Sequence, residues 1–381
     1  MKYPQERKDS KVDVLILTAS YGGGHMQAAK ALSQALKKLE PCLNIETLDY
    51  VRWINTRLDS FTKLAYVKVT SKAPSLWHLL YDITDRPFFA KHGLTRRLGY
   101  QRLYSYIMQI KPKIIVSTHF LTSAVVGELK KRKLISTPLV TVITDNVLHA
   151  FWLNSFVDLY LVANENIKRD LIQYGVASEK VETTGIPIDL KFSVSYDKMV
   201  LRQQHHLIPR LPTILIMSGA YGIGDITGIC HFLAHFEHKI QVIVIAGKDK
   251  RLKRKITNLT YNSKNNFHIL GYVTNVFELM NTSDLLISKA GGLTTSEALA
   301  SNLPMLIYKP IPGQEEGNAT YLRNAGAAVI ASNMDEFIKW FNEIVFSDSK
   351  LKAMSQACLN YKKPLAALRG SELLLDRFKL S

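Results

Sequence analysis

Short apolar runs alternate along the chain with longer segments in which apolar residues recur at helical spacing. The first run, Val12 to Thr18, is followed by the glycines at 22–24 and by an amphipathic pattern over Met26 to Leu39. A short continuous apolar run beside a glycine turn is typical of a strand buried on both faces, whereas apolar residues three and four apart indicate a helix. We therefore predict a strand, a tight loop and a helix, in that order.

The same alternation continues through the first half of the chain. Further strands are predicted at Ile114–Ser117, Leu139–Ile143 and Leu159–Val162, and helices at Ser123–Lys131 and Ile167–Tyr174. Strands that alternate with helices form a parallel sheet covered on both faces. The predicted fold class is therefore α/β.

A polar passage at residues 191–211 interrupts this pattern, which then begins again. Beyond it we predict three strands and a helix, at Thr213–Met217, Ile240–Ala246, Leu285–Ser288 and Gly292–Ala300. At ~100–200 residues per domain, 381 residues suffice for two. We expect an N-terminal domain over 1–190, a linker over 191–211 and a C-terminal domain over 212–381, whose last helix can pack back on the first domain. Ligands of such sheets bind beyond the carboxyl ends of the strands.

The chain is strongly basic, with 49 Lys and Arg against 32 Asp and Glu and a formal charge of +17. This balance indicates an anionic partner such as a nucleic acid, a nucleotide substrate or an acidic membrane. Residues 51–113 hold 12 Lys or Arg and 3 Asp or Glu, interleaved with aromatic residues such as Trp53 and Trp77. Such a segment suits attachment to anionic headgroups. The alternative is an ordinary helical segment with buried rings and solvated cations.

The positions of the cysteines, histidines and apolar residues argue against a disulfide framework, a metal centre and a membrane span. The three cysteines lie far apart and lack CxxC spacing, which favours a reducing cytoplasm. His231, His235 and His238 have the spacing of a metal-binding helix, but no Cys or HExxH pattern accompanies them, so we expect no metal and no other cofactor. No window supplies the ~20 apolar residues that cross a bilayer, so we expect any membrane contact to be peripheral.

Three glycine clusters follow predicted strands, at residues 21–25, 218–224 and 290–295. Glycine lets backbone amides approach a ligand closely, and the start of the following helix offers unpaired N–H groups and a positive dipole end to phosphate. None of the three contains GxxxxGK[ST] or a complete GxGxxG motif, which argues against a kinase or an NAD-dependent enzyme. In the third cluster, phosphate would bind the amides at the helix start, with Glu297 within reach of a ribose diol.

With these motifs the chain resembles the lipid-directed glycosyltransferases that comprise monogalactosyldiacylglycerol synthases and processive diacylglycerol glucosyltransferases. More distantly, it resembles the transferase that adds N-acetylglucosamine to lipid I. The resemblance covers most of the chain and rests on residues 22–25, 28–29, 117–120, 142–145, 184–188, 271–273, 289–294, 297, 310–315 and 318–319. It implies a GT-B fold, in which two Rossmann-like domains with parallel sheets face each other across a cleft. The C-terminal domain would hold a UDP-sugar, and the lipid acceptor would approach through the N-terminal domain.

The resemblance also implies a set of donor-binding residues: Gly24, Ser218, Gly219, Tyr272, Val273, Gly292, Leu293, Thr294, Glu297, Gln314, Glu315 and Asn318. The diphosphate would lie near Ser218 and Gly219 and on the amides of 292–294. Uracil would lie between Tyr272 and Val273, and the ribose hydroxyls on Glu297. The sugar would contact Gln314 and Glu315, with Asn318 close by.

Inverting transfer needs a base that takes the proton from the acceptor hydroxyl while that oxygen attacks the anomeric carbon. His25, on the first glycine loop, suits this role because an unperturbed imidazole has a pKa near ~6.5. The alternative is that His25 caps the following helix or contacts phosphate. His119 is a second catalytic candidate, which would position substrate or act on the acceptor side. Asp145 is a third, which could orient a histidine, contact the acceptor or only cap its loop.

We therefore predict a bacterial enzyme, peripheral to the cytoplasmic face of the cell membrane, that transfers a hexose from UDP-sugar to diacylglycerol with inversion. Glucose is favoured over galactose as the sugar. Transfer of further sugars to the first product is an alternative to a single transfer. An isoprenoid-diphosphate acceptor is an alternative. A nucleic-acid-binding protein and a nucleotide-sugar sensor are alternatives from other classes, and we expect no nucleic-acid partner because RNP, KH and helix-turn-helix signatures are absent. The cationic run at 248–255 is either the solvated face of a helix or a further contact with anionic lipid.

Overall fold

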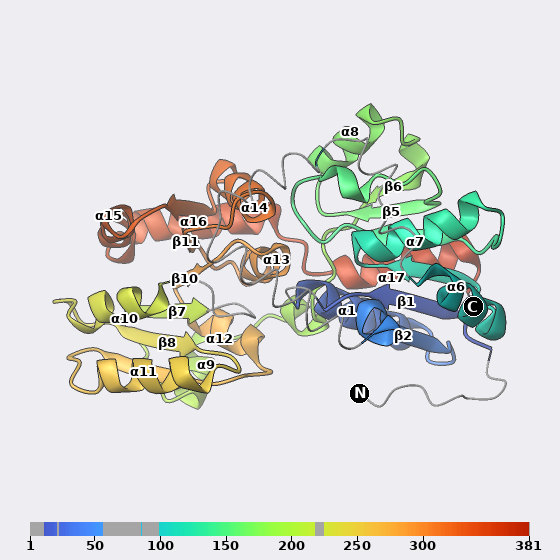
Figure 1. The fold of residues 1–381 in the computed structure, drawn as a ribbon. Coiled ribbons are helices and arrows are strands. Elements are labelled where there is room, and N and C mark those ends of the chain that lie inside the picture. The colour runs from blue at the N-terminus through green and yellow to red at the C-terminus, as the bar shows by residue number, and fades with distance from the viewer. Residues whose placement is uncertain (1–10, 21–22, 56–84, 86–98, 218–224, 381) are drawn as a thin grey trace. The chain divides into compact units, whose positions relative to one another are not determined.

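The chain divides into two compact units in a computed structural model that describes residues 11–20, 23–55, 85, 99–217 and 225–380 (Figure 1). Unit 1 contains the described residues up to Leu190 together with residues 365–380. Unit 2 contains the described residues from 191 to 364, including the segment 191–211 for which the sequence predicts a linker. The chain thus leaves the first unit and returns to it.

Unit 1 is built on a parallel sheet in the order β2-β1-β3-β4-β5-β6. Its strands are β1 (Val14–Thr18), β2 (Ile45–Asp49), β3 (Ile114–Ser117), β4 (Leu139–Val142), β5 (Leu159–Val162) and β6 (Val181–Thr183). Every residue of β1, β3, β4 and β5 is buried, which explains why these strands are continuous apolar runs.

The helices of unit 1 join successive strands, apart from the last one. They are α1 (Gly24–Leu39), α2 (Tyr50–Ile54), α6 (Tyr100–Ile110), α7 (Phe120–Lys131), α8 (Glu165–Gln173) and α17 (Ala366–Phe378). Short 3-10 turns lie at Ala150–Trp152, Ser178–Lys180 and Leu190–Ser193.

Helix α17 packs against α1 and completes the core of unit 1. Leu374 and Leu380 are buried in one cluster with strands β1, β3, β4 and β5. Gly370 lets α17 lie close to strand β5, since a Cβ at this position would lie 3.3 Å from Cδ1 of Leu161. The most C-terminal described helix is therefore part of the first unit's structure rather than an appendage of the second.

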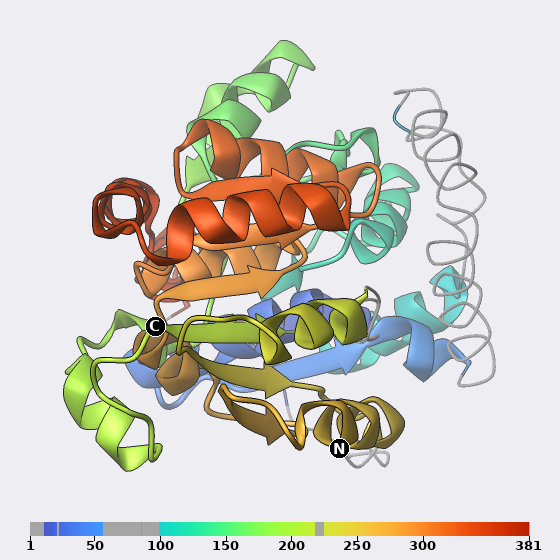
Figure 2. The ribbon, with the colours of Figure 1, turned by 90° about the vertical axis from the view of Figure 1, so that its left-hand side faces the viewer.

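Unit 2 repeats this architecture with the strand order β12-β11-β10-β7-β8-β9. Its strands are β7 (Thr213–Met217), β8 (Gln241–Ile245), β9 (Asn266–Leu270), β10 (Leu285–Ser288), β11 (Met305–Tyr308) and β12 (Ala328–Ala331). Its helices run alongside the strands (Figure 2) and are α9 (Lys198–Gln204), α10 (Ile226–Ala234), α11 (Lys250–Thr260), α12 (Val276–Thr282), α13 (Gly292–Ala300), α14 (Gln314–Asn324), α15 (Met334–Val345) and α16 (Asp348–Tyr361).

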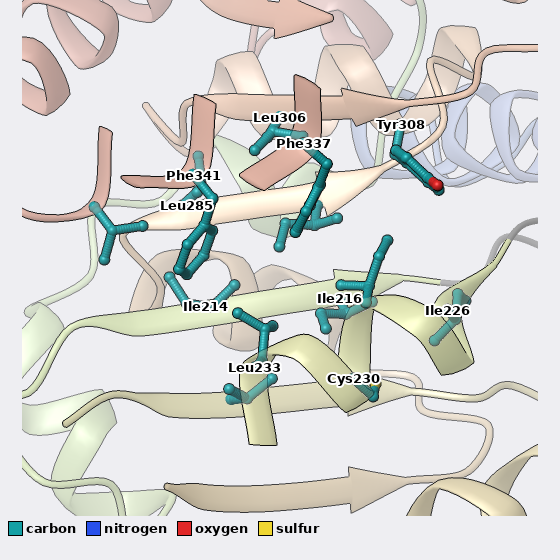
Figure 3. Packing of buried hydrophobic residues seen from close by; sticks show 14 of the residues in the cluster. Ile214, Ile216, Ile226, Cys230, Leu233, Leu285, Leu306, Tyr308, Phe337 and Phe341 are labelled. Carbon is teal, nitrogen blue, oxygen red and sulfur yellow. The ribbon is translucent and has the colours of Figure 1, made fainter. Parts of the chain in front are cut away.

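The core of unit 2 is rich in aromatic rings. Phe337 and Phe341 of α15 point toward the strands and toward α10 (Figure 3). Phe232 of α10 meets both rings edge to face, with centroid separations of 6.0 and 5.8 Å. Such pairs stabilise a core beyond their buried area. Helices α10 and α15 therefore share one face of the sheet.

Residues 191–211 are held in unit 2 by a network centred on Asp284, which precedes β10. Arg202 of α9 is only 5% exposed, and its guanidinium donates to Asp284 Oδ2 at 2.7 Å and to the Thr282 carbonyl at 2.9 Å. Lys198 Nζ lies 2.5 Å from Asp284 Oδ1, and the backbone N–H of Thr213 donates to Oδ2 at 2.8 Å. One carboxylate thus joins α9, β7 and β10.

We expect Asp284→Ala to lower the unfolding temperature of the chain, because it leaves the buried Arg202 guanidinium without its counter-charge. Removing one partner of such a pair costs about 3 kcal/mol, which shifts the midpoint by roughly 6–12 °C in a unit of this size. Differential scanning calorimetry measures the shift. Glu343→Ala, which breaks the exposed pair with Lys350, is the control and should change the midpoint little. Equal midpoints for the two variants would contradict this account.

The structure confirms the predicted α/β class with two parallel sheets. Strands at 114–117, 159–162, 213–217 and 285–288 have the predicted bounds. None of the described helices is long and apolar enough to cross a bilayer. Most of the basic and aromatic segment 51–113 lies outside the described residues, so its predicted membrane contact stays a prediction.

Candidate active site

Three loops meet at the carboxyl end of the unit 1 sheet, after β1, β3 and β4. These strands are neighbours, since β3 pairs with both β1 and β4. His25, in the first turn of α1, places Nδ1 2.9 Å from the carbonyl oxygen of Thr118, which follows β3. The hydroxyl oxygen of Thr144, beyond β4, lies 2.7 Å from the same nitrogen. The fold therefore surrounds one imidazole nitrogen of His25 with oxygens from two other loops.

These contacts determine which ring nitrogen carries the proton. A backbone carbonyl can only accept a hydrogen bond, so Nδ1 of His25 carries the hydrogen that it donates to Thr118. Nε2 is then the unprotonated nitrogen of the neutral ring. Among the described residues, Nε2 has no hydrogen-bond partner. The ring thus offers a lone pair to a proton donor, as a general base must.

Burial lowers the pKa of His25 from 6.5 to about 4, although the hydrogen bond to the Thr118 carbonyl opposes this shift. The ring is therefore neutral at pH 7 and able to accept a proton. His25 is not the N-cap of α1, which is Gly23, and Nδ1 of the His25 ring lies against Thr118 and Thr144 instead. Gly23 has φ 85°, a left-handed conformation that favours glycine, and it is followed by Gly24 as the first residue of α1.

His119 caps helix α7, and its Nδ1 accepts the backbone N–H of Leu121 at 3.2 Å. The side chain is buried, and its ring meets that of His25 edge to face with a centroid separation of 4.6 Å. Burial, with a smaller contribution from His25, holds the pKa of His119 well below 6.5. His119 is therefore a neutral neighbour that shapes the surroundings of His25, and its predicted catalytic role stays a prediction.

Asp145 directly follows Thr144 on the loop after β4, and its side chain is buried. The same loop is held by Asn164, whose side-chain amide donates to the Asn146 carbonyl at 2.9 Å. This placement puts Asp145 in the loop that contacts His25. Its role in orienting a histidine or contacting an acceptor stays a prediction.

In unit 2 the start of helix α13 presents backbone amides that the described part of the chain does not use. The N-cap Gly291 has no side-chain cap, and the N–H groups of Gly292, Leu293 and Thr294 have no hydrogen-bond partner among the described residues. The hydroxyls of Thr295 and Ser296 both turn back onto the Gly292 carbonyl. The amides are therefore open to a ligand at the positive end of the helix. Glu297 lies in the second turn of the same helix.

Lys289 and Glu315 place opposite charges beside this helix start. Burial lowers the pKa of Lys289, and the Glu315 carboxylate opposes that shift. Burial raises the pKa of Glu315. Two neighbours oppose this rise: the Lys289 ammonium, and the backbone N–H of Ile311, which donates to Oε2 of Glu315 at 2.8 Å. Among the described residues, Lys289 Nζ makes no hydrogen bond. A desolvated ammonium without such a partner is suited to an anionic ligand.

The remaining predicted donor residues occupy loops of unit 2. The amide of Asn318 donates to the Ala290 carbonyl at 2.9 Å and so fixes the loop that leads into α13. Gln314 is the first residue of α14. Tyr272 and Val273 lie between β9 and α12, and the Tyr272 ring is 62% exposed with Lys248 Nζ 5.4 Å from its centroid. Ser218 and Gly219 lie outside the described residues.

Sequence reasoning missed three residues that the structure places at these sites. Thr118 and Thr144 contact His25, and Lys289 stands before α13. Each follows the end of a strand, within two residues of it, and lies in a motif that carries the resemblance. Their position at the carboxyl edge of the sheet was the signal that could have found them. Among the described residues, no group of three or more His, Cys, Asp or Glu side chains could hold a metal ion.

Two parallel sheets with their candidate residues at the carboxyl ends define a GT-B protein. Solved structures support this class: the crystal structure of Acinetobacter baumannii MurG matches with a TM-score of 0.61 at 15% identity, over 96% of this chain and 99% of that one. The S. aureus MnaA-UDP co-structure matches with a TM-score of 0.63 at 14% identity, over 97% and 98%.

The family follows from sequence similarity. Family models for monogalactosyldiacylglycerol (MGDG) synthase and for the glycosyltransferase family 28 C-terminal domain match residues 25–188 and 214–367. A processive diacylglycerol beta-glucosyltransferase of Bacillus cytotoxicus is 32% identical, over 95% of this chain and 93% of the relative. One of Bacillus licheniformis is 31% identical over the same shares. The chain belongs to this family of glycosyltransferases, and the predicted resemblance is confirmed.

Proposed function

We propose that the protein transfers glucose from UDP-glucose to diacylglycerol with inversion and forms a β-glucosyl-diacylglycerol. The names of the Bacillus relatives support this choice of sugar and acceptor. The observation that carries the chemistry is the contact between Nδ1 of His25 and the Thr118 carbonyl oxygen, from which it follows that the Nε2 lone pair is available. A base of this kind is what a neutral alcohol acceptor needs.

In the proposed reaction the acceptor hydroxyl loses its proton to Nε2 of His25. The acceptor oxygen forms a bond to the anomeric carbon as the bond from that carbon to the UDP oxygen breaks, so the configuration inverts. Thr118 and Thr144 hold the ring through Nδ1 and so keep Nε2 unprotonated. The charge on the departing diphosphate is neutralised by the α13 amides and by Lys289 without a metal ion.

We further propose that the enzyme works at the cytoplasmic face of the cell membrane as a peripheral protein, because diacylglycerol is dissolved in the bilayer. The basic surface of the chain suits such a position. The nucleotide would bind in unit 2, with its diphosphate on α13, the ribose hydroxyls on Glu297 and uracil at Tyr272 and Val273. The family membership and the open amides of α13 support this assignment.

Mass and thin-layer analysis of the products formed from several UDP-sugars tests the proposal. The acceptors are vesicles with diacylglycerol, vesicles without it and vesicles with an isoprenoid diphosphate. We expect UDP to be released from UDP-glucose only with diacylglycerol, and NMR to show a β linkage. If a galactosyl product forms from UDP-galactose and no product forms from UDP-glucose, the transferred sugar is galactose rather than glucose. Transfer only to the isoprenoid diphosphate, or UDP binding without turnover, would overturn the proposed acceptor or the enzyme assignment.

A further inference from the structure

Helix α11 lies beside the sheet of unit 2 (Figure 1). Its exposed side chains are densely cationic. Residues 248–264 contain seven Lys or Arg and a single acidic residue, Asp249. The cations of α11 and of the loop before it are all exposed: Lys248, Lys250, Arg251, Lys253, Arg254 and Lys255. This arrangement is much more basic than a mixed protein surface.

None of these six cations forms an ion pair within the part of the chain that the structure describes. The carboxylate of Asp249 does not neutralise them directly, because it caps the helix by accepting the backbone N–H groups of Arg251 and Leu252 at 2.9 Å. Lys248 is the one cation with a ring contact, 5.4 Å from the Tyr272 centroid. The remaining charges face solvent.

The apolar face of α11 is already used inside the unit. Ile256 is fully buried in the core, and Leu252 and Leu259 pack against it. The helix therefore has no apolar face left with which to sink into a lipid layer. Any ligand of its outer face has to be recognised by charge.

Two exposed tyrosines lie at opposite ends of the helix. Tyr261, the C-terminal cap residue, is 84% exposed. At the other end lies Tyr272, because the loop before α11 runs beside the loop after β9: a Cβ on Gly271 would lie 3.7 Å from the Gly247 carbonyl oxygen. A ring with a polar tip beside cations, such as that of Tyr261, suits the headgroup region of a bilayer, whereas Tyr272 marks where the helix adjoins the expected uracil loop.

We propose that the outer face of α11 binds the anionic phospholipid headgroups of a bilayer, so that unit 2 has a membrane contact of its own. The choice of a bilayer over a nucleic acid rests on the proposed function, since the acceptor is a membrane lipid. The binding is electrostatic and weakens as salt rises. Because the loop before α11 adjoins Tyr272, this contact lies next to the loop that is expected to bind the uracil.

Co-sedimentation of the full chain with vesicles tests this surface. The test variant is Lys253→Gln/Arg254→Gln/Lys255→Gln, and the matched control Arg323→Gln/Lys339→Gln/Lys352→Gln removes three exposed cations from α14, α15 and α16. At ~1 kcal/mol per cation near an anionic surface, the test variant should bind phosphatidylglycerol-containing vesicles about a hundredfold more weakly. The control should bind like the original protein, and phosphatidylcholine vesicles should bind all three weakly.

Wild-type affinity of the α11 variant, or an equal loss in the control, would overturn the proposal. So would an α11 variant that loses single-stranded RNA binding while vesicle binding is unchanged, because the surface would then be a nucleic-acid site. Glucose transfer to diacylglycerol in detergent micelles is measured in parallel and should be the same for all three proteins. If none of them transfers glucose, the proposed function fails while the vesicle result still decides the lipid contact.

Discussion

Turnover of His25→Ala should fall about 10²–10⁴-fold, while its affinity for UDP stays that of the original protein. The reason is geometric: Nδ1 is occupied by Thr118 and Thr144, and Nε2 offers the lone pair that would take the acceptor proton. Steady-state kinetics with UDP-glucose and diacylglycerol micelles give the turnover, and calorimetric titration gives the UDP affinity. His235→Ala, on the surface of unit 2, is the control and should be fully active.

Near-normal turnover of His25→Ala would show that His25 is not the base, and loss of UDP affinity would reassign His25 to donor binding.

The pH dependence of the reaction is a further test of His25. Because burial lowers the pKa of His25 to about 4, the ring becomes protonated only in strongly acidic solution. We expect kcat/KM to fall on the acid side near pH 4 rather than near 6.5, since this ratio reports the free enzyme. An acid limb near 6.5 would contradict the buried, neutral ring.

The second large effect is expected for Lys289→Met, which should lower turnover about 10²–10³-fold. The variant removes the ammonium that stands before α13, where charge develops on the departing diphosphate. The variant also leaves the buried Glu315 carboxyl, whose pKa burial raises, without its neighbouring positive charge. Single-turnover kinetics separate this loss in the chemical step from changes in product release.

The double variant Lys289→Met/Glu315→Gln is the matched control for this prediction. It removes the ammonium without leaving a buried carboxylate unpaired. Glu315→Gln alone gives the baseline, because Glu315 is itself expected to contact the sugar. If turnover of the double variant stays well below that of Glu315→Gln, the ammonium itself acts on the diphosphate. If turnover returns, the loss in the single variant came from the stranded carboxylate, and Lys289 has only a structural role.

The fold was predictable where burial on both faces makes a strand a continuous apolar run. This applies to Ile114–Ser117 and Leu285–Ser288, which have every residue buried. Edge strands lack this signal: β2 reads IETLD and β9 reads NFHIL, with mostly half-exposed residues, and sequence analysis predicted neither. The segment 191–211 looks polar along the chain, but two of its cations, Lys198 and Arg202, pair with Asp284, about 80 positions away.

The candidate site was predictable as a set of motifs but not as a set of contacts. Sequence reasoning named His25 as a base, but the oxygen partners of Nδ1 come from loops 93 and 119 positions away. His119 was named as a candidate that would position substrate, and this stays a prediction; the sequence did not show that its Nδ1 accepts the backbone N–H of Leu121 in α7. Pairings across a sheet edge follow from strand order, which the linear pattern does not contain.

The return of α17 to the first unit reverses the usual order of folding during synthesis. Domains generally complete themselves from the N-terminus as the ribosome delivers them. Here the residues that close the first core, Leu374 and Leu380, are translated after the whole described part of unit 2. Unit 2 can therefore fold while the core of unit 1 still lacks the helix that covers it.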